Sequence, residues 1–595
     1  MLRLLRHETA QYLANELRNL LPTEELGSDA ATSFFAVEKL ENALEKPKKI
    51  EHGHLALPVF PLAKQLRQPP PAIAAKFAQS LSEKLSSDAG QKLGLIRIEP
   101  VGGFLNFTFS DISLQTRLFG AIAEEGERLG YSKLGAGKRI VIDYSSPNVA
   151  KPMHVGTLRA TVIGQAIRNI AETQGYEVIG LNHLGDWGVQ FGKLAWAYRK
   201  WGHEYDFKNT AFQSLFDLYV RFHDEATKDP SLDAEGSLVF KQLEQGDKEI
   251  EKIWKMFVEI TLVEDQKLWD LLGVKHDLVR GESFYNDRLK PVEDLLDKKG
   301  LLVESEGAMV VSFGDEMPPC LIRKSDGASL YATRDIASAI YRKEELKADL
   351  CLYVVGVDQT LHFKQVFKVL ELAGFDWSKE CHHISFGLYR FKDGVKMSTR
   401  KGNVIFLEDI LRQAIERTGE IIAAKNPSLS DGDRKQIAQD VGVGAVIFND
   451  LSFDRVKNVE FDWERILSFE GDSGPYVQYM HVRCASLLRK YKEAKGKTPR
   501  LKDVAVLSQP EERELVRLLL TYDEVLESAF ATFKPNILAQ YLLEVCAAFS
   551  RFYHGNRILG EAEDVESSRM ALVFATKAVL QQGLKRLSVN APEVM

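Results

Sequence analysis

The sharpest change in hydrophobic pattern along the chain lies between residues 140 and 167. Three apolar β-branched residues at 140–142 precede a polar segment with two prolines, and apolar residues then recur at helical spacing over 158–167. This pattern predicts a strand, a short turn and a helix. A helix N-terminus offers free N–H groups and a partial positive charge, so nucleotides commonly bind at such a turn in α/β proteins. His154, Gly156 and Thr157 fall at the mouth of the predicted helix.

Strand-like runs alternate with helical periodicity through the middle of the chain. Further strands are predicted at 176–182, 309–313, 350–356 and 383–386, whereas residues from about 195 to 300 are strongly charged and helical. Strands that alternate with helices favour a parallel sheet. The predicted fold class is therefore α/β, with a doubly wound, Rossmann-like parallel-sheet domain at 116–410 that carries a helical insertion at about 195–300.

The two ends of the chain have different patterns. Residues 1–115 are predicted to form a separate α+β unit, with helical periodicity at 8–21 and 73–85 and strand-like alternation at 96–99 and 104–109. Strand-like patterns stop after about Leu411. Residues 411–465 are expected to be a helical connecting region. Residues 466–595 are expected to be an all-α bundle with long helices at 476–494, 511–533 and 536–554.

Bulk composition excludes some classes of protein. The chain of 595 residues is long enough for three or four domains, and 45% hydrophobic with 27% charged residues is typical of a soluble globular protein. No apolar run approaches the roughly 18–20 residues of a membrane helix, and early acidic residues argue against a transit peptide. We therefore expect a cytoplasmic protein without a membrane partner. The formal charge of −7 means that any nucleic-acid site must be a local basic patch.

The five cysteines are scattered and contain no C-x-x-C pair. This argues for a reducing compartment and against a disulfide framework or a structural zinc site. The sequence Cys381-His382-His383 could suggest a metal site, but adjacent residues on a strand point to opposite faces. We expect no protein metal site.

Two short signatures suggest the chemistry. The first is His154-Val155-Gly156-Thr157, and the second is the segment at 396–400, with Lys396, Met397 and Ser398. In this order within one α/β region they resemble the HIGH and KMSKS elements of class I aminoacyl-tRNA synthetases. An imidazole at a helix N-terminus can donate a hydrogen bond to a phosphate, and a glycine lets a nucleotide approach the backbone. A basic loop can stabilise the charge that develops on pyrophosphate.

Longer motifs narrow the resemblance. Residues 146–154, 183–192, 331–335 and 469–479 look like arginyl-tRNA synthetase, in the right order, from about residue 115 to the end. The N-terminal unit is similar to that family's additional tRNA-binding domain. The resemblance implies ATP-dependent ligation of L-arginine to tRNA(Arg) through arginyl adenylate, with release of AMP and pyrophosphate, for use in translation. It also implies ATP with Mg²⁺ as a substrate complex, no permanent cofactor, and an anticodon-binding domain at 466–595.

Residue types also suggest an arginine pocket. A guanidinium is a rigid fork of donors that carboxylates satisfy and that an aromatic ring can cap. Tyr331 and Asp335 share a face if Tyr331 opens a helix. The resemblance assigns the side-chain pocket to this pair and to Asp143, and it assigns the amino-acid head group to Asn148 and Gln359. Paired carboxylates would discriminate against lysine and citrulline.

The chain departs from the family signatures at two positions. Thr157 stands where the second histidine of the first motif is more common, and Thr399 replaces the second lysine of the other. Thr157 retains a hydroxyl that can hydrogen-bond. Arg400, Lys401 or Lys151 could supply the missing charge, and we favour Lys151 with help from Lys396. ATP is thus expected to contact His154, Gly156, Thr157 and Lys396.

A basic run with interleaved tyrosines marks a candidate tRNA surface in the C-terminal part. Phosphate contacts give affinity there, and aromatic rings can stack on splayed bases. The run comprises Arg483, Arg489, Lys490, Lys492, Lys495, Lys497, Arg500 and Lys502, with Tyr476, Tyr479 and Tyr491.

Two other functional classes stay open at this point. One is a small adenylyltransferase of the same nucleotide-binding superfamily, which would need neither the C-terminal bundle nor the Tyr331–Asp335 pair. The other is a catalytically inactive, synthetase-like RNA-binding module, which Thr157 and Thr399 suggest. Nothing in the sequence indicates an obligate dimer, so a monomer is expected.

Overall fold

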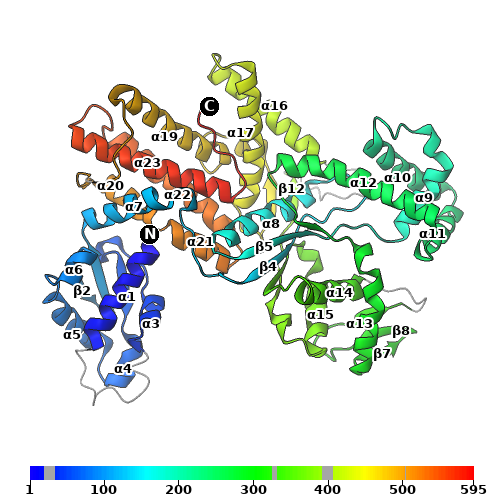
Figure 1. Cartoon of the computed structure of the whole chain (residues 1–595), viewed down its shortest axis with the longest axis horizontal. Coiled ribbons are helices and arrows are strands. Elements are labelled where there is room, and N and C mark those ends of the chain that lie inside the picture. Colours follow the sequence, from blue (N-terminus) through cyan, green and yellow to red (C-terminus); the bar gives the residue numbers. More distant parts are fainter. Residues whose placement is uncertain (19–33, 325–330, 392–405, 503) are drawn as a thin grey trace.

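A five-stranded parallel sheet lies at the centre of the chain. The computed structural model describes residues 1–18, 34–324, 331–391, 406–502 and 504–595 (Figure 1). All neighbouring strands of the sheet are parallel. In spatial order the strands are β11 (Cys381–His383), β10 (Leu350–Tyr353), β4 (Arg139–Asp143), β5 (Glu177–Asn182) and β6 (Leu278–Val279).

Strand β4 is buried on both faces, as the apolar run at 140–142 predicts. Ile140 and Ile142 pack into the core that contains helix α8 (Val155–Thr173). Val141 points to the opposite face and packs with Phe363 of helix α15 (Thr360–Leu372). Because side chains alternate across a strand, one β-branched run serves helices on both sides of the sheet. The doubly wound architecture predicted from the sequence is confirmed.

One predicted strand belongs to a different sheet, and one strand of the parallel sheet was not predicted. The run at 309–313 does not enter the parallel sheet; β8 (Ala308–Val311) pairs antiparallel with β7 (Leu302–Ser305) and β9 (Cys320–Arg323). A short apolar run does not reveal which sheet it joins. Conversely, β6 falls inside the range 195–300 that was expected to be helical insertion. It has only two residues, too few to give a periodic signal.

Two lobes project from the sheet at the lower right and upper right of Figure 1. The upper lobe has its own apolar core, to which Phe191, Phe222 and Phe257 contribute. Its helices are α9 (Val189–Trp201), α10 (Ala211–Lys228), α11 (Ser231–Glu244) and α12 (Lys248–Leu271). The lower lobe combines the β7–β8–β9 sheet with α13 (Asn286–Lys298), α14 (Tyr331–Glu344) and α15.

The N-terminal part is an α+β unit, as predicted. Its antiparallel sheet has the order β1 (Leu55–Pro58), β3 (Phe104–Phe109), β2 (Leu95–Val101). The prolines at 69–71 precede and open α5, where a missing N–H costs nothing. The helices of this part and of the following connection are α1 (Leu2–Arg18), α3 (Val37–Ala43), α4 (Phe60–Leu66), α5 (Pro70–Ser82), α6 (Asp88–Leu93) and α7 (Asp111–Glu125).

The C-terminal part is dominated by helices, with one exception. Strand β13 (Val459–Phe461) pairs in parallel with β12 (Tyr389–Phe391), so the expectation that strands end near Leu411 is wrong. The predicted helix at 511–533 is two helices that meet at Thr521. The helices are α16 (Leu407–Lys425), α17 (Asp431–Leu451), α18 (Trp463–Ile466), α19 (Gly474–Lys495), α20 (Pro510–Leu520), α21 (Tyr522–Ala531), α22 (Asn536–Gly555) and α23 (Glu563–Arg586).

The helices in the described ranges include none that is long and apolar enough to cross a membrane.

A buried ion pair joins helix α8 to the C-terminal helices. The Arg159 Nε atom lies 3.2 Å from Asp450 Oδ2, and both side chains are fully buried. Arg159 Nη1 donates to the carbonyls of Gly387 (2.7 Å) and Lys457 (2.9 Å). The Tyr389 hydroxyl donates to Asp450 Oδ2 at 2.6 Å. One guanidinium therefore joins α8, α17 and the segments next to β12 and β13.

We predict that Arg159→Met is strongly destabilising. The substitution keeps an apolar stem but leaves Asp450 as a buried charge, and removal of one partner of a buried pair costs about 3–5 kcal/mol. The corresponding calorimetric transition should fall by roughly 6–20 °C for a unit of this size. The control is Arg412→Met, because Arg412 is exposed and forms only surface pairs with Asp409 and Glu416. Equal shifts for the two variants would show that the buried pair does not hold α8 in place.

Candidate active site

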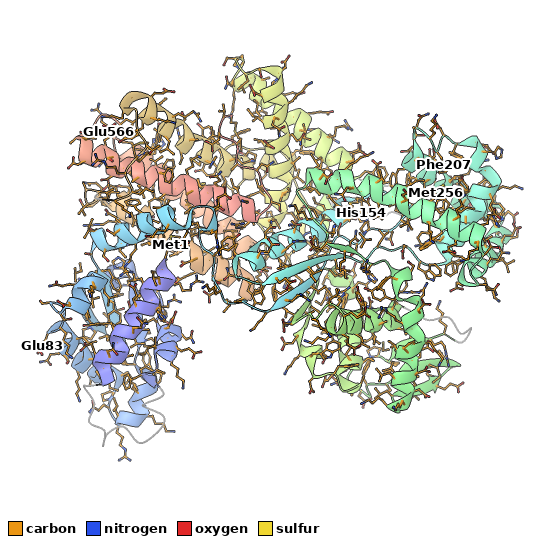
Figure 2. The ribbon with its side chains drawn as sticks, viewed as in Figure 1. Met1, Glu83, His154, Phe207, Met256 and Glu566 are labelled. Carbon is orange, nitrogen blue, oxygen red and sulfur yellow. The ribbon has the colours of Figure 1, made fainter. Side chains whose placement is uncertain are left out.

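His154 caps the N-terminus of helix α8. Its backbone is extended, and its Nδ1 atom accepts a hydrogen bond from the Gly156 N–H at 3.0 Å. Burial, aided by the positive charge of Lys151, lowers the pKa of His154 below 6.5. A neutral imidazole that accepts at Nδ1 carries its proton on Nε2. The site therefore presents a neutral N–H donor at the positive end of the α8 dipole. Figure 2 labels His154 within the whole chain.

Gly156 and Thr157 support this histidine through the backbone. A Cβ atom at residue 156 would lie 2.7 Å from His154 Cε1 and 2.8 Å from Nδ1. Glycine is thus required for the position of the imidazole, in addition to the expected close approach of a nucleotide. The Thr157 N–H donates to the His154 carbonyl at 2.8 Å, and its side chain is half-buried.

The turn between β4 and α8 contains an unusual concentration of left-handed backbone. Ser145, Ser146 and Ala150 have φ values of 72°, 46° and 63°. Such conformations are costly for residues other than glycine and persist where the surroundings impose them. The Ala150 N–H donates to Thr261 Oγ1 of α12 at 3.1 Å. Lys151 follows, with its Nζ 5.2 Å from the ring centre of Tyr219 in α10.

A second turn, after β5, is attached to the first. Residues 148 and 185 form a parallel bridge, and a Cβ at Gly185 would lie 2.3 Å from Asn148 Oδ1. Asp186 accepts from the Ser283 backbone (2.8 Å) and hydroxyl (2.7 Å), and its carbonyl accepts from Trp254 Nε1 of α12 (2.7 Å). Burial raises the pKa of Asp186, although the hydrogen bonds from Ser283 oppose this increase. The motif at 183–192 therefore fixes the upper lobe against the sheet edge, while the Asn148 residue stays exposed.

Asp143 already has partners within the chain. Its Oδ2 accepts from Arg342 Nη2 at 2.7 Å, and its Oδ1 accepts from Ser146 Oγ at 2.8 Å. Arg342 is fully buried and lies 4.4 Å from the ring centre of Tyr353. Asp143 therefore neutralises an internal guanidinium. Its expected contact with a bound arginine stays a prediction.

Tyr331 and Asp335 lie one turn apart on helix α14, which begins at Tyr331 as the spacing predicts. Asp335 Oδ2 lies 2.6 Å from His362 Nε2 of α15. Burial alone would raise the pKa of Asp335, but the His362 hydrogen bond and the charges of His183 and Arg342 hold it below 3.8. Asp335 is thus an ionised acid, whereas Tyr331 is 64% exposed above it.

Glu282 is a candidate residue that the sequence analysis missed. It follows β6, and burial raises its pKa to about 7, although Arg334 opposes the shift; the charges of Asp186 and Asp335 raise it further. The Glu282 and Arg334 side chains approach to 4.0 Å. Glu282 and Asp335 therefore repel one another in a buried region that a cation would stabilise. The only sequence signal was a glutamate after a two-residue strand, in the range assigned to the insertion.

All these turns lie at one edge of the sheet. They follow the carboxyl ends of β4, β5, β6 and β10, and Gln359 lies exposed in the short 3₁₀ helix after β10. In open parallel sheets this edge is where ligands bind. The topology thus brings the expected residues His154, Asn148 and Gln359 to a common edge, and Asp335 of α14 is linked to α15, which follows Gln359, through its contact with His362.

The predicted residues Lys396, Met397 and Ser398, and Thr399 beside them, lie outside the described residues. The flanking residues can be placed. Strand β12 ends at Phe391, and Phe406 forms an antiparallel bridge with His154. The Leu407 N–H also donates to the Met153 carbonyl at 2.9 Å. Phe406, the first described residue after position 405, therefore lies beside His154. Among the described residues, no three His, Cys, Asp or Glu side chains form a group that could hold a metal ion.

Comparison with known families agrees with this geometry. A family model described as the catalytic domain of class I tRNA synthetases (R) matches residues 121–463. The chain belongs to the arginyl-tRNA synthetase family. The arginyl tRNA synthetase N-terminal domain matches residues 8–109, and the DALR anticodon binding domain matches residues 477–595.

Relatives of the chain cover almost its whole length. The arginine–tRNA ligase of Clostridium perfringens is 43% identical over 561 residues, which is 94% of this chain and 97% of the relative. That of Clostridium beijerinckii is 44% identical with the same coverage. The solved arginyl-tRNA synthetase of Thermus thermophilus has a TM-score of 0.78 and 27% identity, and covers 93% of this chain and 96% of its own.

A cavity of about 540 Å³ lies between the end of α16 and the start of α19, at the edge of the DALR region. Its wall includes Phe469, Tyr476, Tyr479 and Arg483, together with Met595. The Arg483 guanidinium carbon lies 4.4 Å from the ring centre of Tyr553 and 5.6 Å from that of Tyr479. Aromatic rings beside a cation form a surface suited to an unstacked nucleobase.

Proposed function

We propose that this chain catalyses the ATP-dependent ligation of L-arginine to tRNA(Arg). The observation that supports the proposal is the sheet edge itself: it has a neutral imidazole donor at a helix N-terminus, and the adjoining lobe has two half-buried acids, Glu282 and Asp335, that interact electrostatically. Arginine offers a guanidinium to the acids and a carboxylate to the nucleotide. No covalent enzyme intermediate is required, because the work is positioning and charge stabilisation.

The first step is displacement at the α-phosphate of ATP. An oxygen of the arginine carboxylate forms a bond to this phosphorus while the bond to the bridging oxygen breaks, and its electron pair leaves with pyrophosphate. The Nε2–H of His154 donates to a phosphate oxygen, and the positive end of the α8 dipole stabilises the negative charge of the phosphates. Lys151 and Lys396 stabilise the leaving charge, with Thr157, Met397 and Ser398 in supporting positions. ATP enters as its Mg²⁺ complex.

The pocket for the arginine side chain is formed by Asp335, Glu282 and Tyr331. Two carboxylates match the guanidinium fork, and Tyr331 covers it. Asn148 and Gln359 hold the amino-acid head group. Lysine lacks the planar fork, and citrulline would leave buried acids unpaired, so both are rejected. Arg342, which is paired with Asp143, also helps to keep Asp335 of this pocket ionised through its positive charge.

In the second step the terminal ribose hydroxyl of tRNA attacks the arginyl carbonyl. The ester bond to the ribose oxygen forms while the bond between the carbonyl carbon and the AMP phosphate oxygen breaks; AMP leaves with that electron pair, and the hydroxyl proton is released to solvent. We propose that residues 466–595 hold the anticodon loop, with the cavity beside Tyr479 as a base site. The N-terminal unit at 1–115 is an additional tRNA contact. Residues 411–465 connect the catalytic domain at 116–410 to the anticodon-binding domain at 466–595. The protein acts as a monomer in the cytoplasm.

Arginine-dependent ATP–pyrophosphate exchange, run with and without tRNA(Arg), tests the function. The wild-type chain should exchange in at least one condition. In Asp335→Asn, kcat/KM for arginine should fall by about 30-fold or more, since one partner of a buried charged pair is lost. The control is Glu344→Gln, which removes a carboxylate from an exposed position of the same helix and should be near normal.

Three outcomes would contradict this proposal. Absence of exchange in both conditions would favour an inactive RNA-binding module. Exchange that no amino acid stimulates would favour a small adenylyltransferase. A normal kcat/KM for arginine in Asp335→Asn would show that the guanidinium pocket lies elsewhere.

The raised pKa of Glu282 predicts a pH-dependent arginine affinity. Only the carboxylate attracts the guanidinium, and Glu282 titrates in the folded protein near 7. The dissociation constant should therefore rise by up to about 10-fold per unit as pH falls below 7, and should level off above it. Calorimetry at pH 7 in phosphate and in Tris should also detect release of roughly half a proton.

The matched variant is Glu282→Gln, which should bind arginine more weakly and without this pH dependence. In the absence of arginine, a rise in pH has the opposite effect and is unfavourable. An acid whose pKa is higher in the folded than in the unfolded protein lowers the free energy of unfolding as pH rises from about 4.5 to about 7. Glu282→Gln should remove this loss as well. A pH dependence that persists unchanged in Glu282→Gln would assign the titration to another group.

A further inference from the structure

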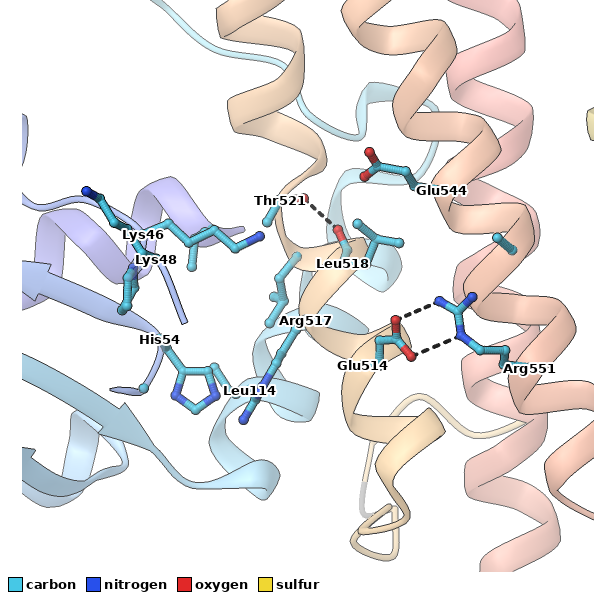
Figure 3. A pocket seen from close by; sticks show the side chains of 15 residues that line it. Lys46, Lys48, His54, Leu114, Glu514, Arg517, Leu518, Thr521, Glu544 and Arg551 are labelled. Atoms are coloured by element: carbon cyan, nitrogen blue, oxygen red, sulfur yellow. Dashed lines mark hydrogen bonds and ion pairs between the residues drawn. The ribbon is translucent and has the colours of Figure 1, made fainter. Parts of the chain in front are cut away.

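A cavity of about 520 Å³ separates the N-terminal unit from the C-terminal helices (Figure 3). One wall is formed by the segments around Lys46–Lys48 and Gly53–His54, and another by α20 and α22. Leu114 of α7 lines it as well. The cavity is remote from His154 and takes no part in the chemistry described above. Its polar lining is dominated by nitrogen donors.

His54 directs an N–H group into this region. Its Nδ1 atom accepts from the Phe109 N–H at 3.1 Å. Burial, together with the charges of Arg517 and Arg97, lowers the pKa of His54 to about 3. The neutral ring therefore has its proton on Nε2, which is buried and has no hydrogen-bond partner among the described residues. The preceding Gly53 has φ of 110°, and a Cβ there would lie 2.6 Å from the Phe107 carbonyl, so this backbone position requires glycine.

Arg517 of α20 is the second unsatisfied donor. Its Nε atom is buried without a partner, and no hydrogen bond or ion pair joins its guanidinium to any residue in the described ranges. Burial lowers its pKa against the attraction of Asp111. Asp111 itself is paired with Arg513 at 2.8 Å. In Figure 3 the side chains of Arg517 and His54 lie side by side.

The charge around these two donors is positive. Lys46 and Lys48 are exposed at the mouth. On the far wall Arg551 is bonded to Glu514, with Arg551 Nη2 2.6 Å from Glu514 Oε1, so that this pair is neutral. Glu544 is the remaining acid among the lining residues. Arg517 is half-buried and its buried Nε atom has no partner, so a bound anion would satisfy a donor that the described residues leave unpaired.

We propose that this cavity binds a phosphate group carried on an organic body, with Arg517 and His54 as its ligands. The guanidinium fork and an imidazole N–H match phosphate oxygens, and the two lysines balance the second charge. Phosphate alone would leave most of the cavity empty, and Leu2, Leu114 and Leu518 supply apolar wall for a sugar or base. The phosphate belongs either to a free mononucleotide-like ester or to an RNA nucleotide.

The test uses the full-length chain and Arg517→Met, with Arg513→Met as the matched control. Both variants remove a guanidinium from helix α20, but Arg513 does not line the cavity. The first arm titrates inorganic phosphate and uridine 5′-monophosphate by calorimetry. The second measures the dissociation constant of a tRNA(Arg) transcript at several salt concentrations. Loss of one charge-assisted contact should weaken binding by roughly 10-fold or more.

The two sources of phosphate give different results. Loss of phosphate or uridylate binding in Arg517→Met alone identifies a free ester. Weaker tRNA binding in Arg517→Met alone, with a salt slope reduced by about 0.7–0.9, identifies an RNA phosphate. The double variant Lys46→Met/Lys48→Met, which changes two exposed positions, should weaken binding of the same ligand. If Arg517→Met and Arg513→Met behave alike in both arms, the proposal is overturned.

Thermal stability separates this role from a structural one. Because Arg517 lacks a partner, Arg517→Met without ligand should melt at the same temperature as wild type or higher. Arginine-dependent exchange should be unchanged in the condition, without tRNA(Arg) or with saturating tRNA(Arg), in which the wild-type chain is active, so failure here is distinguishable from failure of the proposed ligase function. A melting temperature lower than that of Arg513→Met would mean that the guanidinium stabilises the fold, and would also overturn the proposal.

Discussion

The buried guanidinium of Arg159 is the contact on which the arrangement of the active site depends. It lies on the first turns of α8, a few residues after His154, and it binds Asp450 and two backbone carbonyls from distant segments. These partners lie next to β12 and β13 and on α17. Because buried charges tolerate little displacement, α8 cannot shift relative to the C-terminal helices without loss of this pair. This ion pair thus holds the N-terminus of α8, where ATP is proposed to bind, in place.

Two different electrostatic environments lie along the sheet edge. At the start of α8, burial and Lys151 keep His154 neutral, so that it donates without adding charge. Around α14, Asp335 is ionised while the nearby Glu282 holds its proton up to about pH 7. A cation is favoured in the second environment and a phosphate in the first. An arginine that spans the two would bring its carboxylate toward the nucleotide, as in-line attack on the α-phosphate requires.

Local patterns in the sequence were sufficient for the parts with regular periodicity. The run at 140–167 predicts β4, the turn and α8, and the spacing of Tyr331 and Asp335 predicts the start of α14. Features set by distant pairs could not be predicted in this way. Arg342 meets Asp143 across 199 positions, and Arg159 meets Asp450 across 291. β6 has only two residues, too few to show a hydrophobic period, so Glu282, which follows it, could not be predicted as a site residue.

A crystal structure with a non-hydrolysable arginyl-adenylate analogue would show both halves of the proposed site at once. We predict the guanidinium between Asp335 and Glu282, with Tyr331 over it, and the phosphate-mimicking group within hydrogen-bond distance of His154 Nε2. The backbone of the turn at 145–150 should keep its left-handed residues. A guanidinium bound away from α14, or an analogue whose phosphate mimic does not reach His154, would contradict the assignment of the two sites to one sheet edge.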